Sequence, residues 1–123
     1  MRSILLVSHG SKAPQAREEI EALAALLKKR SGVKTVQPAF LEIESPDIPE
    51  GIRRCVHQGA TEVTILLNFL NSGRHAGDDI PKIIRQARKE HPGVKFQMTK
   101  PIGQEDYLVD IFLKLLDDPK DIV

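Results

Sequence analysis

Residues 4–11 read Ile4-Leu5-Leu6-Val7-Ser8-His9-Gly10-Ser11, and this stretch decides the fold. A run of consecutive apolar residues that ends at a turn signal is typical of a strand buried on both faces of a sheet. Gly10 indicates that the backbone turns directly after the strand. His9 is therefore expected at the carboxyl end of a central strand, which in open α/β sheets is the edge where ligands bind.

Strand-like and helix-like segments alternate along the rest of the chain. Strands are predicted over residues 33–41, 62–67 and 94–98, and helices over 13–29, from Asp47 to about Gln58, from Asp78 or Asp79 to about His91, and over 105–116. This order predicts a single three-layer α/β domain over residues 1–123, in which helices flank a four-stranded parallel sheet on both faces. The apolar residues of the last helix are sufficient to cover the sheet: Leu108, Ile111, Phe112, Leu115 and Leu116.

Composition narrows the class of partner. The 123 residues include 18 lysines and arginines against 17 aspartates and glutamates, a formal charge of +1 without a long run of either sign. This balance gives no sign of the basic patch that binds nucleic acid or an anionic membrane, so the expected partners are small molecules. The apolar stretch near the N-terminus is too short for a signal peptide or a spanning helix, which predicts a cytoplasmic protein. The single cysteine, Cys55, is predicted to be a buried or half-buried core residue.

Polar side chains follow three of the predicted strands. His9 ends the first strand, Glu42 follows the second, and His75 lies in the loop after the third. Carboxyl ends of parallel strands share one edge of the sheet, so these three side chains can converge. Two imidazoles and a carboxylate suit a divalent cation such as Co²⁺, Ni²⁺, Fe²⁺ or Zn²⁺, and they suit proton transfer equally well. The alternative is that they are turn residues bonded to the loop backbone.

The other two histidines fall at predicted helix ends. His57 lies near the end of the second helix and His91 near the end of the third. A cationic side chain complements the carbonyl end of a helix dipole. Both are interpreted as structural residues.

Several motifs together resemble a known family. In chain order they are Ser8-His9-Gly10-Ser11, Ala39-Phe40-Leu41-Glu42 with Ser45-Pro46, Phe69-Leu70, Gly73-Arg74-His75 and Asp79-Ile80-Pro81. Their order and spacing resemble the short form of the CbiX/SirB class II tetrapyrrole chelatases, from His9 to about Gly103. The chain departs from the family pattern at Leu67-Asn68-Phe69-Leu70, where the family often has Pro-Leu-Phe-Leu, and at Gly73-Arg74-His75, where the family has Gly-Gly-His.

The resemblance implies a metallochelatase that inserts a divalent metal into sirohydrochlorin, in cobalamin or sirohaem biosynthesis. Co²⁺ is the first choice of metal, with Fe²⁺ or Ni²⁺ as alternatives, and no organic cofactor is implied. The family's metal-site histidines map onto His9 and His75, and its acidic residue maps onto Glu42; these three are the expected catalytic residues. A homodimer is expected, because longer members carry two such domains with the substrate between them.

The tetrapyrrole is expected to contact residues around these positions. Sirohydrochlorin carries carboxylates, and the guanidinium of Arg74 can grip a carboxylate in bidentate fashion. The full set of expected tetrapyrrole contacts is Ser11, Phe69, Ser72, Gly73 and Arg74.

Two other functions remain open on the sequence. A non-catalytic carrier would bind metal or tetrapyrrole through the same residues without turnover. A histidine phosphatase also places a histidine after its first strand, but Ser8 here occupies the position of the arginine that clamps phosphate in that class.

Overall fold

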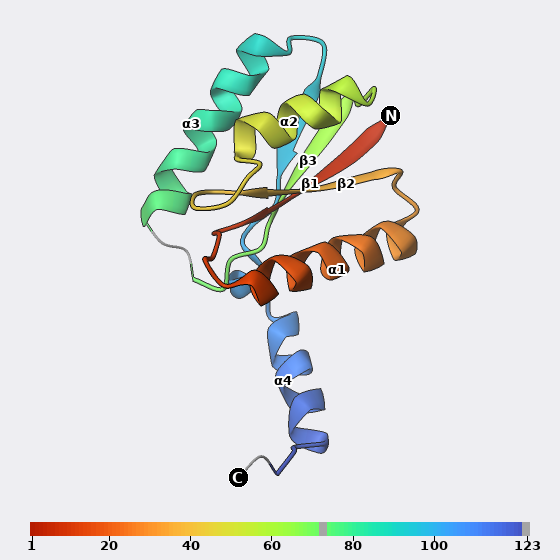
Figure 1. Cartoon of the computed structure of the whole chain (residues 1–123), viewed down its shortest axis with the longest axis vertical. Coiled ribbons are helices and arrows are strands. Elements are labelled where there is room, and N and C mark those ends of the chain that lie inside the picture. Colours follow the sequence, from red (N-terminus) through yellow and green to blue (C-terminus); the bar gives the residue numbers. More distant parts are fainter. Residues whose placement is uncertain (72–73, 122–123) are drawn as a thin grey trace.

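The computed structural model describes residues 1–71 and 74–121, with the backbone alone described at 74–76. It is an α/β structure with a four-stranded parallel sheet flanked by helices, which confirms the predicted class (Figure 1). The elements in chain order are β1 (Arg2–Ser8), α1 (Pro14–Ser31), β2 (Thr35–Phe40), α2 (Ile48–His57), β3 (Glu62–Leu67), α3 (Arg74–Glu90), β4 (Lys95–Met98), the 3₁₀ turn η1 (Ile102–Gln104) and α4 (Tyr107–Asp117).

The sheet order is β2-β1-β3-β4, so the first strand of the chain is a central strand. In β1, Leu5 lies opposite Gln37 of β2 and Ile65 of β3. Leu5 and Val7 are fully buried, as expected for a strand covered on both faces. Helices α2 and α3 cover one face and α1 lies on the other (Figure 1). The main core lies between the sheet and the pair α2 and α3, and its largest buried residues include Ile48, Ile52, Ile65 and Ile80.

Several element boundaries differ from the prediction by one or two residues, and two starts, those of β2 and α3, differ for a structural reason. β2 begins at Thr35 and not at 33, because Gly32 takes a left-handed conformation (φ 73°) and the Val33 N–H donates to Oγ of Ser31 at 3.2 Å, which makes a turn of this segment. α3 begins at Arg74, and Pro81 therefore lies inside the helix. The predicted start at Asp78 or Asp79 is wrong, since Pro81 was assigned to the first helical turn where proline is favoured.

The last helix differs most from expectation. Its apolar residues are sufficient to cover the sheet, but they do not do so: α4 has no buried residue and projects away from the sheet and the other helices (Figure 1). Leu115 and Leu116 are 65% and 71% exposed. Within residues 1–71 and 74–121, the sheet face that carries α1 has no second helix over β3 and β4.

Among residues 1–71 and 74–121, no helix is both long and apolar enough to cross a bilayer.

Candidate functional site

The carboxyl ends of β1 and β2 bring His9 and Glu42 together. Nε2 of His9 lies 2.7 Å from Oε1 of Glu42. The two side chains are 54% and 60% exposed, so both can reach a molecule that arrives at this edge of the sheet. One imidazole nitrogen and one carboxylate oxygen form a two-donor arrangement that can hold a cation or pass a proton.

Backbone pairing beyond the strand ends fixes this contact. The Leu41 N–H donates to the Ser8 carbonyl at 2.9 Å, and the Glu42 N–H donates to the His9 carbonyl at 3.0 Å. Gly10 follows with a φ of 109°, which glycine adopts without strain. A Cβ at residue 10 would lie 1.9 Å from the carbonyl oxygen of Glu42. The two loops can approach this closely because residue 10 has no side chain.

Phe69 packs beside the imidazole of His9. The two rings meet edge to face, with centroids 6.5 Å apart and planes at 89°. Phe69 follows β3 and is 6% exposed, so most of its ring is covered. The sequence predicted Phe69 as a tetrapyrrole contact, and the structure places its ring next to His9.

A second set of contacts, which sequence reasoning missed, holds the loop after β2. Oε2 of Glu44 accepts from the Ser11 N–H at 2.9 Å, and Arg17 of α1 donates from Nη1 to the Ser45 carbonyl at 2.9 Å. The Arg17 guanidinium also lies over the Phe40 ring, 5.5 Å from its centroid. Ser11, predicted to contact tetrapyrrole, therefore uses its backbone N–H to hold Glu44.

Asn68 ties the end of β3 to the end of β1. Its Nδ2 donates to Oγ of Ser8 at 3.1 Å, and its backbone N–H donates to the Val7 carbonyl at 2.8 Å. The loop toward α3 therefore starts beside the strand that carries His9. Asn68, a position at which the chain departs from the family pattern, therefore has a structural role.

The remaining predicted site residues are Ser72, Gly73, Arg74 and His75. The backbone of Arg74 and His75 forms the first turn of α3, while Ser72 and Gly73, and the side chains of Arg74 and His75, lie outside the described residues. The convergence of His75 on His9 and Glu42 stays a prediction. Among the side chains that the structure describes, no group of three His, Cys, Asp or Glu is placed to hold a metal.

The two histidines interpreted as structural lie at helix ends. His57 is in the last turn of α2. His91 follows α3 directly, with its N–H bonded to the Ala87 carbonyl and its Nε2 4.0 Å from a Glu90 carboxylate oxygen. Neither is part of the edge formed by the ends of β1 and β2.

The sequence of the chain is similar to those of known proteins. A family model described as CbiX matches residues 3–118. The sirohydrochlorin ferrochelatase of Arabidopsis thaliana chloroplasts is 34% identical over 108 residues, which are 88% of this chain and 48% of the relative. The sirohydrochlorin cobaltochelatase of Methanocaldococcus jannaschii is 26% identical over 137 aligned positions, covering 92% of this chain and 96% of the relative.

A solved structure has the same fold. The sirohydrochlorin chelatase SirB from Bacillus subtilis subspecies spizizenii, determined in complex with cobalt, superposes with a TM-score of 0.83 at 32% identity. The match covers 94% of this chain and 50% of that one. The chain thus spans about half the length of this structure and of the Arabidopsis relative.

Proposed function

The chain belongs to the CbiX family, and on that premise we propose that it is a sirohydrochlorin chelatase, which inserts a divalent metal ion into the tetrapyrrole. The observation that carries the proposal is the His9 and Glu42 pair, 2.7 Å apart and exposed at the carboxyl edge of the sheet. Relatives of this chain are named as sirohydrochlorin ferrochelatases and cobaltochelatases.

The chemistry of insertion explains why these residue types are useful. The incoming ion must lose water ligands, and the macrocycle must lose two pyrrole protons before its nitrogens bind the ion. A neutral imidazole at His9 holds the ion through a nitrogen lone pair, and the adjacent carboxylate of Glu42 either shares the ion or accepts a proton. His75, in the first turn of α3, is proposed as the second imidazole ligand. Phe69 lies beside His9, and Gly10 allows the two loops to approach each other.

The proposed metal is Co²⁺, with Fe²⁺ or Ni²⁺ as alternatives, since nitrogen and carboxylate oxygen donors suit all three ions. The corresponding pathway is cobalamin or sirohaem biosynthesis, in the cytoplasm. The proposed partners are sirohydrochlorin and the metal ion, and no organic cofactor is required. Because one domain offers one side of a cleft, a homodimer is proposed to enclose the tetrapyrrole.

Metal insertion can be tested directly. Purified protein is mixed anaerobically with sirohydrochlorin and Co²⁺, Fe²⁺ or Ni²⁺, and the absorbance change of the tetrapyrrole is followed. Several turnovers per chain, faster than in the absence of protein, are expected. An absorbance change limited to one equivalent per binding site would instead identify a carrier, and no effect on the rate would refute the proposal.

A matched pair of variants assigns the activity to the site. His9→Ala is expected to lower the rate about 100-fold or more, the range for loss of a group that moves protons in the transition state. His57→Ala, at the end of α2, is expected to retain the wild-type rate. Equal rates for both variants would remove His9 from the mechanism.

A further inference from the structure

The loop between β2 and α2 holds Glu42 against His9 although its tip is exposed. The side chain of Glu42 is 60% exposed and Ile43 is 58% exposed, so packing of these two residues gives the tip little support. Ile43 also has a φ of 74°, in a backbone region that β-branched residues rarely adopt. Such a conformation persists only where surrounding contacts impose it. The position of Glu42 therefore depends on contacts made by other residues of the loop.

Glu44 makes one of these contacts from a largely covered position. Its side chain is 12% exposed, and its Oε2 accepts from the Ser11 N–H at 2.9 Å. Ser11 lies in the loop that follows β1, two residues after His9. The backbone of Glu44 is held as well, because its N–H donates to the Glu42 carbonyl at 2.8 Å. One carboxylate thus joins the loop that carries His9 to the loop that carries Glu42.

Arg17 joins the same loop to α1. Its Nη1 donates to the Ser45 carbonyl at 2.9 Å and lies 3.5 Å from Oε1 of Glu44. Its guanidinium lies over the ring of Phe40, the last residue of β2, 5.5 Å from the ring centroid. The two carboxylate oxygens of Glu44 therefore face different donors, the Ser11 N–H and the guanidinium. A carboxylate held in this way is suited to fixing a loop.

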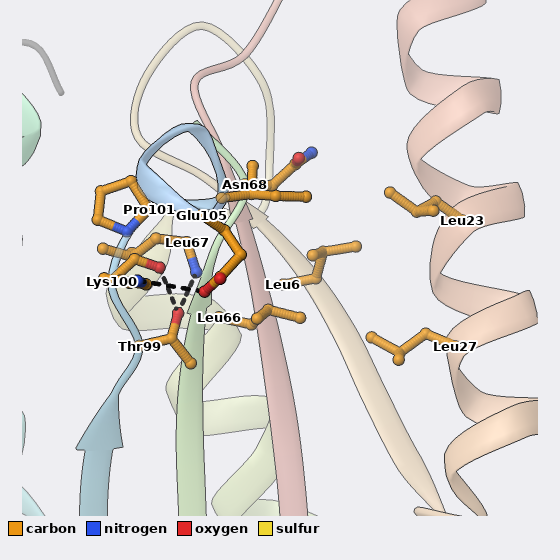
Figure 2. Close-up of a pocket in the computed structure, with 11 residues that line it drawn as sticks. Leu6, Leu23, Leu27, Leu66, Leu67, Asn68, Thr99, Lys100, Pro101 and Glu105 are labelled. Carbon is orange, nitrogen blue, oxygen red and sulfur yellow. Dashed lines mark hydrogen bonds and ion pairs between the residues drawn. The ribbon is translucent and has the colours of Figure 1, made fainter. Parts of the chain in front are cut away.

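The other partner, His9, has a separate attachment. Asn68, which Figure 2 shows at the end of β3, donates from Nδ2 to Oγ of Ser8 at 3.1 Å. His9 follows Ser8 directly, so its backbone is tied to β3 independently of Glu44. Loss of the Glu44 contacts is therefore expected to displace Glu42 more than His9.

On the premise that the chain is a chelatase, we propose that Glu44 is a positioning residue for the pair formed by His9 and Glu42. Its hydrogen bond to the Ser11 N–H and its contact with Arg17 hold the loop so that the Glu42 carboxylate meets the imidazole. Glu44 acts through Glu42 and neither binds the metal nor takes up a proton. Its role requires an acceptor oxygen and not a negative charge, whereas Glu42 uses its charge and basicity.

Two substitutions at residue 44 separate these requirements. Glu44→Ala removes the acceptor and is expected to lower kcat for Co²⁺ insertion about 10-fold or more, the effect of misplacing a reacting group. Glu44→Gln keeps an amide oxygen for the Ser11 N–H and is expected to stay within about threefold of the wild type. The KM for sirohydrochlorin should be unchanged in both, since Glu44 acts through Glu42. Circular dichroism at the assay temperature corrects each rate for the folded fraction.

Glu21→Ala is the matched control. Oε1 of Glu21 also pairs with Arg17, at 3.1 Å from Nε, but both residues belong to α1. This variant is expected to insert Co²⁺ at the wild-type rate. A wild-type kcat in Glu44→Ala would overturn the proposal. Equal losses in Glu44→Ala and Glu44→Gln would also overturn it, because they would assign the effect to the charge.

A double variant tests whether Glu44 acts through Glu42. In a Glu42→Gln background, Glu44→Ala is expected to lower kcat by less than about twofold further, because residues that act as a unit are not additive. A full additional loss would show that Glu44 acts independently and would overturn the proposal. Where Glu44→Ala does not fold, Arg17→Met removes the other anchor of the loop. It is expected to lower kcat about threefold or more at unchanged KM, and a wild-type kcat would count against the proposal.

Nuclear magnetic resonance of the metal-free protein gives a readout that does not depend on activity. A nuclear Overhauser effect between the ring protons of His9 and the γ protons of Glu42 is expected in the wild type and in Glu44→Gln. It should be lost or strongly weakened in Glu44→Ala, and an unchanged effect there would overturn the proposal. If the wild type inserted no metal, the chelatase proposal would fall, and this contact would still decide whether Glu44 positions Glu42.

Discussion

A single methyl group at residue 10 would separate the two loops that carry His9 and Glu42. The added carbon would lie 1.9 Å from the Glu42 carbonyl oxygen, and the φ of 109° is one that side-chain-bearing residues rarely adopt. Steric overlap and backbone strain would both destabilise a protein with a side chain at residue 10. The distance between the two reactive side chains therefore depends on a residue that has no reactive group.

Gly10→Ala is expected to lower the free energy of unfolding by about 1–3 kcal/mol and to reduce metal insertion by more than that loss of folded protein explains. Gly32→Ala is the control, because residue 32 also has a positive φ, of 73°, but open space around its Cβ. The control is expected to lose about 1 kcal/mol and to keep its specific activity. Urea unfolding and insertion rates are measured for both. A Gly10→Ala protein with full activity would show that the loop spacing is unimportant.

Glu42→Gln keeps the shape of the side chain and removes its charge and basicity. The insertion rate is expected to fall at least about 10-fold, while tetrapyrrole binding remains. Stability should change by less than about 1 kcal/mol, because the His9 and Glu42 pair is exposed. Glu50→Gln, which removes another exposed carboxylate that pairs with Arg53, is the control for rate. A wild-type rate in Glu42→Gln would exclude the carboxylate from the rate-limiting step.

Cys55 makes the stability of the folded protein depend on pH in the alkaline range. Burial raises the pKa of its thiol from 9.0 to about 11. The unfolded state therefore loses the proton first as the pH rises, so the contribution of this thiol to stability is complete below pH 9 and is lost between about pH 9 and 11.

We expect the free energy of unfolding of the wild type to fall between pH 8 and pH 10 by about 1 kcal/mol more than that of Cys55→Ala. Groups that titrate in both proteins cancel in this comparison. Urea unfolding at the two pH values measures the difference. Parallel losses in the two proteins would mean that the thiol ionises equally in the folded and unfolded states.

At the scale of elements, α2 lies unusually close to the sheet. A Cβ at Gly51 would lie 2.8 Å from the Ala39 Cβ of β2 and 2.8 Å from Cδ1 of Leu5 in β1. Gly51 is therefore a packing requirement and not a flexible point in the helix. Asp47 caps the start of this helix, where its Oδ1 accepts from the Glu50 N–H at 2.9 Å.

Two glycine substitutions in helices are expected to change the free energy of unfolding in opposite directions. Gly51→Ala should destabilise the protein by about 1–2 kcal/mol, because overpacking outweighs the gain in helix propensity. Gly77→Ala in α3, where an added Cβ meets nothing within 4 Å, should stabilise it by about 0.5–1 kcal/mol. Urea unfolding of both variants is the measurement, and the same sign for both would contradict the packing argument.

Sequence patterns predicted the order and type of the elements, because the spacing of apolar residues and the turn residues between elements are local signals. The meeting of His9 and Glu42 was also predictable, since parallel strands place their carboxyl ends at one edge. The contacts of Glu44 were not predictable, because they depend on a loop in which Ile43 takes a φ of 74°. The location of α4 was not predictable for a different reason: an apolar helix surface does not show which other surface it packs against.

At the scale of the whole molecule, assembly and activity are expected to be linked. If two copies are needed to enclose the tetrapyrrole, specific activity should fall when the protein is diluted below the dissociation constant of the dimer. Insertion rates over a dilution series, compared with sedimentation over the same range, test this expectation. Specific activity that stays constant while the mass falls to one chain would show that a single copy is sufficient.

The central position of β1 also has a consequence for synthesis on the ribosome. β1 pairs with β2 and β3, which both follow it in the chain, and β3 ends only at Leu67. Until β3 has been made, the apolar residues of β1 lack one of their two neighbouring strands, the kind of exposed segment that aggregates or binds a chaperone. The opening residues that determine the fold are therefore also those for which the nascent chain needs the longest protection.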